Sequence, residues 1–189
     1  MKKILSGLIL LLLVTLISGC GNDKLEKTLK KMSDAESYSM TLTMENIPIF
    51  GTMEMKAKVD GDKEYFYMTG LEFYLSKENE TTYIYTKVGS TWEKTEYSEA
   101  DLDLPIEVDE VDPKDFDAKW FKKEDDKYIL QEEYYEEIFA EEAEMVKSLE
   151  IEIDDDDFII YYEMSLEGFV IKVTLEITDI NKTTIKLPK

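Results

Sequence analysis

A two-residue alternation of apolar and polar side chains runs through most of this 189-residue chain and limits what it can fold into. Within 38–44, apolar residues occupy every even position and hydroxyl-bearing residues lie between them. The stretches 53–59 and 169–177 alternate in nearly the same way. Because successive side chains of a β-strand point to opposite faces, each stretch predicts a strand with one apolar face and one wet face.

The same pattern recurs often enough to predict about eleven short strands. The other predicted strands cover 64–69, 71–77, 81–88, 91–97, 118–123, 127–131, 149–153 and 158–166, and a last short extended piece covers 183–188. Helical spacing of apolar residues predicts one short helix from 23 to about 33–36 and a second over 132–148. We therefore expect an α+β fold, in which an antiparallel sheet curls and two helices cover its apolar concave face.

The composition excludes several classes of functional site. The chain has 43 acidic and 22 basic residues, and every base is lysine; histidine and arginine are absent, and there is one cysteine. Histidine-based triads, zinc sites built on His or Cys clusters and intrachain disulfides are therefore impossible. A net charge of −21 argues against nucleic acid as a partner. Since neither a nucleophile-elbow motif nor a phosphate-binding loop occurs, we expect no enzymatic activity, no cofactor and no resident metal.

The N-terminus has the pattern of an export signal. Lys2 and Lys3 precede an apolar run over 4–17, which is too short for a comfortable membrane span. The run ends in Ile17-Ser18-Gly19-Cys20, which resembles the lipobox of bacterial lipoproteins. The resemblance implies that residues 1–19 are removed and that Cys20 is acylated. The alternative is an ordinary signal peptide with a cysteine after its small residues.

These features predict a protein held on the extracytoplasmic face of a cell membrane, in a Gram-positive organism. Two acyl chains anchor firmly, since each buried CH₂ contributes ~0.8 kcal/mol. Anionic headgroups would repel the acidic chain, so the acyl chains rather than the surface would hold it. We expect the mature chain, 20–189, to be a monomer with a single domain. The acidic stretch 98–115, which contains Pro105 and Pro113, is predicted to be a crossover loop.

Three segments carry a resemblance to the LolA-like and LppX/LprG-like lipid-carrier superfamily. The stretch 25–38 (LEKTLKKMSDAESY) resembles its opening helix and the start of its first strand. Residues 82–94 resemble its strand pair ending in tryptophan, and 179–188 resembles its closing strand. The resemblance implies an open half-barrel with helices in its mouth, and several members bind acyl chains or lipoproteins between sheet and helices. The arginine-bearing strand motif of the true lipoprotein carriers has no counterpart, because this chain has no arginine.

The predicted apolar face supplies the candidate ligand site. Its methionines are flexible and polarizable, a property found on surfaces that accept varied apolar partners. The predicted lining residues are Tyr38, Met40, Leu42, Met44, Met53, Met55, Phe66, Met68, Phe73, Phe158, Ile160, Met164, Phe169 and Ile171. We expect a lipid or acyl chain there. The alternative is a filled core without a ligand, in an acidic surface module that meets a protein partner of unknown identity.

Two acidic runs, 124–126 and 154–157, are candidate cation ligands, because calcium prefers carboxylate oxygens. Neither has the spacing of an EF-hand loop, and both fall between predicted strands. Aspartate is common in turns for local hydrogen-bonding reasons, so solvated hairpin tips are the expected outcome and a weak divalent site is the alternative.

Overall fold

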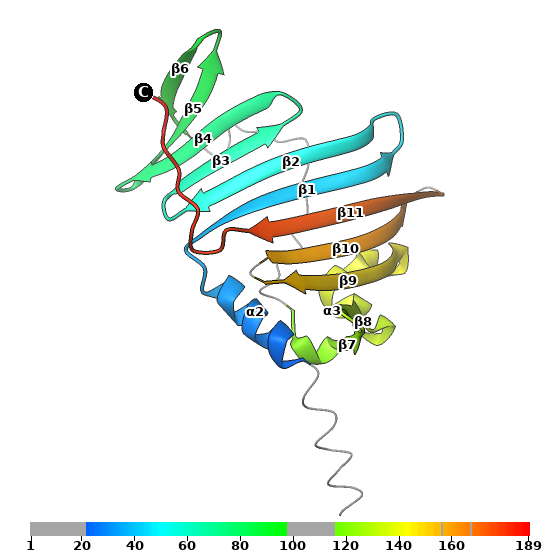
Figure 1. The fold of residues 1–189 in the computed structure, drawn as a ribbon. Helices are drawn as coiled ribbons and strands as arrows, with labels where there is room; N and C mark the ends of the chain where they lie inside the picture. Colours follow the sequence, from blue (N-terminus) through cyan, green and yellow to red (C-terminus); the bar gives the residue numbers. More distant parts are fainter. Residues whose placement is uncertain (1–21, 98–115, 156, 167) are drawn as a thin grey trace, which may run out of the picture.

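The computed structural model describes residues 22–97, 116–155, 157–166 and 168–189. These residues form an α+β fold with one antiparallel sheet of eleven strands and two short α-helices (Figure 1). The sheet is open, because its two outermost strands do not pair with each other. The predicted fold class is confirmed at this level. The predicted leader over 1–19, Cys20 and the predicted crossover loop over 98–115 lie outside the described residues.

The sheet consists of two meanders joined at its centre. The strand order is β6-β5-β4-β3-β2-β1-β11-β10-β9-β8-β7. The first meander comprises β1 (Ser37–Ile47), β2 (Gly51–Asp60), β3 (Lys63–Met68), β4 (Leu71–Glu78), β5 (Thr81–Val88) and β6 (Thr91–Glu96). The second comprises β7 (Phe121–Glu124), β8 (Lys127–Leu130), β9 (Val146–Asp154), β10 (Asp157–Leu166) and β11 (Phe169–Thr178). The first and last strands of the chain are therefore neighbours.

The strand register merges the apolar sides of all the central strands into one face. Met40 lies opposite Ala57 on one side and Ile177 on the other. Ile177 lies opposite Phe158, and Ala57 lies opposite Phe66. Directly opposed residues of antiparallel strands share a face. We call this continuous side of the sheet the apolar face.

Helix α2 (Asp23–Ser33) packs on the half of the apolar face that the second meander forms. Its Leu25, Leu29 and Met32 follow helical spacing and are all buried. They join a cluster with buried residues of β7–β11 and of the segments before and between these strands and after β11: Phe116, Phe121, Tyr128, Leu130, Phe139, Val146, Leu149, Ile151, Ile153, Phe158, Ile160, Ile177 and Ile180. The hydrophobic core of the described chain therefore lies mainly under this second half.

The helix predicted over 132–148 is mostly wrong. The α-helical part, α3, covers only Tyr135–Phe139 and is flanked by the 3₁₀ turns η4 (Glu132–Tyr134) and η5 (Ala140–Met145). Ala140 adopts a left-handed φ of 45°, which interrupts the α-helical path. From Val146 the chain pairs with β10 instead.

Two predicted strands also differ from the structure. Strand β7 begins only at Phe121, because Ala118–Trp120 forms a 3₁₀ turn (η3) whose start is capped by the Asp117 side chain. The stretch 183–188 is not part of the sheet, although it resembled a closing strand. It is an extended tail that crosses the first meander (Figure 1), and its Ile185 N–H donates to the Asp60 carboxylate at 2.9 Å.

Candidate functional site

The apolar face is filled over one half of the sheet and incompletely covered over the other. In the second meander, Phe158, Ile160 and Ile151 have 0–1% of their surface exposed. In β1–β3 the corresponding side chains are only half-buried. We call this group the methionine face; it comprises Leu42, Met44, Met53, Met55, Phe66 and Met68. The same sheet thus carries a closed core and an apolar surface that keeps contact with solvent.

Cross-strand pairing brings the members of the methionine face together. Met44 lies opposite Met53, and Met55 lies opposite both Leu42 and Met68. Phe66 stacks on Phe73 of β4 with ring centroids 5.1 Å apart. Thioether side chains have three rotatable bonds and can adjust to apolar groups of different shape. The geometry therefore offers an adaptable apolar surface with one rigid aromatic margin.

The register places all fourteen predicted lining residues on the apolar face, but in different surroundings. Phe158 and Ile160 belong to the filled core. Tyr38 and Met40 are partly buried and pack against that core. Phe73 and Ile171 are buried, each at 7% exposure, Met164 is half-buried, and Phe169 is 51% exposed beside the β10–β11 turn. Among these predicted lining residues, the six of the methionine face are neighbours that combine apolar chemistry with access from solvent.

Sequence reasoning missed four residues that extend this surface across β4 and β5. Leu75 and Ile84 oppose each other on the same face and are half-buried. Leu71 and Val88 lie at its margin and are 52% and 53% exposed. The alternation in 71–77 and 81–88 contained the signal, because it fixes which side chains share a face.

The other face of the first meander carries a row of aromatic rings. The ring centroid of Tyr74 lies 4.9 Å from that of Tyr65 and 5.2 Å from that of Trp92. Lys94 Nζ lies 3.9 Å from the centroid of the Tyr83 ring. Such pairs contribute about 0.5–1.5 kcal/mol each and support strands that lie outside the main core.

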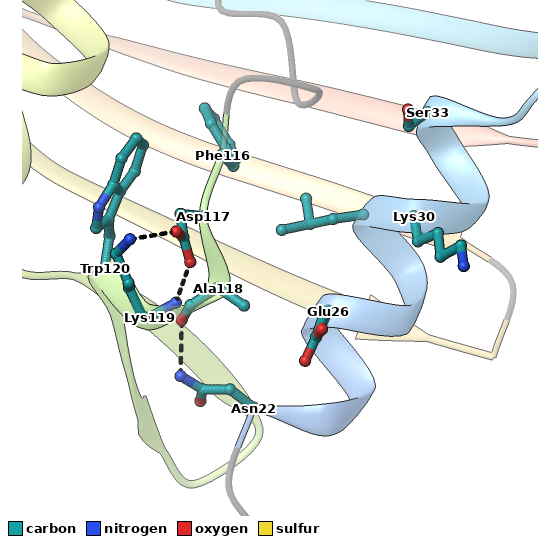
Figure 2. A pocket seen from close by; sticks show the side chains of 10 residues that line it. Asn22, Glu26, Lys30, Ser33, Phe116, Asp117, Ala118, Lys119 and Trp120 are labelled. Atoms are coloured by element: carbon teal, nitrogen blue, oxygen red, sulfur yellow. Dashed lines mark hydrogen bonds and ion pairs between the residues drawn. The ribbon is translucent and has the colours of Figure 1, made fainter. Parts of the chain in front are cut away.

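A groove of about 650 Å³ lies between α2 and the segment before β7 (Figure 2). The Asn22 side chain joins its walls by donating to the Ala118 and Phe121 carbonyls at 2.7 and 2.9 Å. Lys119 pairs with Asp117 at 2.6 Å, and this contact lowers the pKa of the carboxyl. None of the predicted lining residues borders this groove, and its lining mixes charged and apolar side chains.

Both acidic runs lie at hairpin turns. Asp125 and Asp155 adopt left-handed φ values of 52° and 48° in the β7–β8 and β9–β10 turns. Within the described part of the chain, no group of three or more Asp, Glu, His or Cys side chains is arranged to hold a metal ion. The turns predicted from these runs are confirmed.

Comparison with known proteins gives no relative from which a role could be carried over. No model of a known protein family matches the chain, and neither does any curated protein. Among the described residues, no helix combines the length and apolarity required to span a bilayer.

The partly buried Tyr162 predicts a loss of stability at alkaline pH. Burial raises the pKa of the Tyr162 hydroxyl on the apolar face, and Glu142 raises it further. In the unfolded chain a tyrosine loses its proton near pH 10, at about its ordinary pKa. Above that pH the folded state holds more protons, so stability is complete below about pH 10 and falls as the pH rises through the folded-state pKa.

This loss is measurable as a fall in melting temperature between about pH 9 and pH 11.5. Replacing Tyr162 by phenylalanine removes one ionisable hydroxyl and should make the fall less steep. Identical slopes in the two proteins would contradict the assignment.

Proposed function

We propose that this protein is a membrane-anchored extracytoplasmic lipoprotein that binds a lipid or acyl chain on the methionine face. The single observation that carries the proposal is the contrast between the two halves of one apolar face. Where α2 packs, the side chains are closed off; on β1–β3 the same face keeps half-buried Met, Leu and Phe side chains. Continuous apolar surface of this kind is a common mark of binding sites.

The energetics suit an acyl chain. Each methylene removed from water contributes about 0.8 kcal/mol, so ten methylenes would supply ~8 kcal/mol before the costs of association. Those costs amount to at least ~4 kcal/mol, and methionine side chains lose further rotamer freedom when they are ordered. The net value would correspond to modest affinity, which suits a ligand that must be released again.

The proposed location of the protein at a membrane depends on the lipobox. Helix α2 begins at Asp23, so a tether of two residues, Gly21 and Asn22, would separate it from an acylated Cys20. Asn22 is held by its hydrogen bonds to the segment before β7. An anchor there would keep the second meander close to the lipid surface.

The test compares two charge substitutions on opposite faces of one strand. Met55→Glu places a carboxylate within the methionine face, whereas Lys58→Glu places the same group on the exposed polar side of β2. A carboxylate desolvated by an acyl chain is strongly unfavourable. Titration of the purified chain with a fluorescent fatty acid should show affinity at least tenfold weaker for Met55→Glu and unchanged for Lys58→Glu.

Native mass spectrometry supplies the second measurement. A co-purifying acyl species that is present in the parent chain and lost in Met55→Glu supports the proposal. A chain that carries no such species and does not bind the fluorescent fatty acid refutes it. That result would favour the alternative, an acidic surface module without a small-molecule ligand.

A further inference from the structure

The exposed apolar side chains gather at one end of the strands. Within the described ranges, the large hydrophobic residues with high exposure are Ile49, Phe50, Leu71, Val88, Leu166, Phe169 and Val170. Ile49 is 100% exposed and Phe50 is 70% exposed. Scattered single residues of this kind are ordinary, but their collection at one place indicates an interaction surface.

The strand register shows that these residues share one end. The β1–β2 turn lies beside the start of β11, because Glu45 is opposite Lys172 and the Asn46 amide donates to the Val170 carbonyl at 3.3 Å. In Figure 1 this end faces right, where the β1–β2 hairpin and the start of β11 lie together. We call the seven residues the apolar tips.

Strand pairing places the remaining tips at the same end. Met55 of β2 lies opposite Met68, which is directly followed by the β3–β4 turn and by Leu71. Phe73 of β4 lies opposite Thr86 of β5. Leu71 and Val88 are each two residues from this pair in the same direction, so they lie at the same end of the two strands. Several hairpins thus present apolar side chains in one direction.

Four acidic hairpin turns lie at the opposite end. The β2–β3 and β4–β5 turns carry Asp60, Asp62, Glu78 and Glu80. The β7–β8 and β9–β10 turns carry Glu124, Asp125, Asp126, Asp154, Asp155 and Asp157. The register confirms the placement, since Lys127 lies opposite Glu152, and Phe158, next to Asp157, lies opposite Ile177. These acidic turns are therefore separated from the apolar tips, whereas the glutamate-rich segment of η4, α3 and η5 leads into Val146, which lies opposite Met164 toward the end that carries the tips.

We propose that the apolar tips contact a lipid bilayer and insert their side chains into its interfacial region. The tips are protruding side chains of separate turns, which suits shallow insertion between headgroups. The four acidic hairpin turns fit the same occupant, because contact through the tips keeps these turns away from negatively charged lipid. The sequence before α2 adds an independent argument, since the apolar run 4–17 and the lipobox would place the chain at a membrane.

Contact through the tips would give the anchor a second membrane attachment. The acyl chains would supply firm attachment, and a second, weak contact would fix the orientation of the anchored chain. Leu71 and Val88 belong both to the tips and to the margin of the apolar surface next to the methionine face. The docked orientation would therefore bring that surface to the bilayer, although docking itself does not require a ligand there.

The test uses the full chain carrying Cys20→Ser, so that a single introduced thiol can hold an environment-sensitive dye. Thr52→Cys places the dye on an exposed residue beside Ile49 and Phe50 and leaves both intact. Asp126→Cys places it on an exposed residue at the acidic end as the matched control. Each chain is reconstituted into phosphatidylcholine vesicles with or without lipids brominated on their acyl chains. The run 4–17 is present in every chain, so the samples differ only at the tested positions.

Docking predicts that the fluorescence emission of the dye at position 52 shifts to shorter wavelength and is quenched by the brominated acyl chains. The emission of the dye at position 126 should show neither change. The double replacement Ile49→Ser with Phe50→Ser should reduce quenching at position 52 at least threefold. Both side chains are exposed, so the melting temperature should not change. Adding anionic phosphatidylglycerol at low salt should weaken the contact, and salt should restore it.

Three results would overturn the docking proposal. They are equal quenching at positions 52 and 126, no quenching at either, and quenching at 52 that survives loss of Ile49 and Phe50. A concentration-dependent increase in mass that requires the same side chains would assign the tips to a second copy of the chain instead. Met55→Glu separates the two proposals, because it should abolish fatty-acid binding and leave quenching at position 52 unchanged.

Discussion

Phe158→Ala should lower the free energy of unfolding by about 3–5 kcal/mol, which is the usual range for emptying a fully buried aromatic site. Phe158 has no exposed surface and belongs to the cluster that includes the buried side of α2. Its neighbours are held by strands on both sides, since it lies opposite Ile153 and Ile177. Because these neighbours are fixed, they cannot move far into the space left by the removed phenyl ring, and most of that cavity should remain. Urea denaturation followed by circular dichroism measures the change.

Phe66→Ala is the matched control. It removes the same group from the same face, but from a half-buried position on β3. Loss of partial burial and of the contact with Phe73 should amount to about 1–2 kcal/mol. Equal losses for the two variants would mean that the methionine face is as closed as the core. That result would remove the observation on which ligand binding is proposed.

Leu25→Asp should be similarly damaging, with an expected loss of about 3–5 kcal/mol from an unpaired carboxylate in a closed core. Leu25 is 0% exposed and lies on the buried side of α2 with Leu29 and Met32. Either the helix would have to detach from the sheet, or the introduced carboxyl group would have to stay protonated. Either result loosens the second meander, and thermal unfolding monitored by circular dichroism should report it.

Lys27→Asp introduces the same side chain two residues later, on the exposed side of α2. Surface substitutions of this kind usually change stability by less than about 0.5 kcal/mol. A comparable loss from both variants would show that charge on the helix, and not its buried side, governs the effect.

The alternation of side chains predicted most strands and the face on which each apolar residue lies. That success has a physical basis, because a strand has a fixed period of two and one wrong register would turn every side chain over. All fourteen proposed lining residues lie on one face for this reason. The prediction did not distinguish Phe158 from Met55, since burial depends on what packs above a face and alternation contains no information about that layer.

Two of the wrong predictions, the helix over 132–148 and the strand over 183–188, share a cause. Apolar spacing over 132–148 suggested one long helix, but a single backbone position, Ala140, turns the path, and pairing with β10 takes over at Val146. The tail over 183–188 has strand-like composition, yet it crosses the sheet and bonds to the Asp60 side chain. Long-range contacts decided both outcomes, and local sequence reports them weakly.

Placing β1 next to β11 has a consequence for how the chain reaches its native state. A growing polypeptide completes β1–β6 long before residues 169–178 emerge, so β1 spends that time as an uncovered edge bordered by methionine. The central pairing has very high contact order, which slows its formation. An open edge of this kind invites pairing with other chains. We therefore expect assembly to depend on a chaperone that covers β1 until β11 has been synthesised.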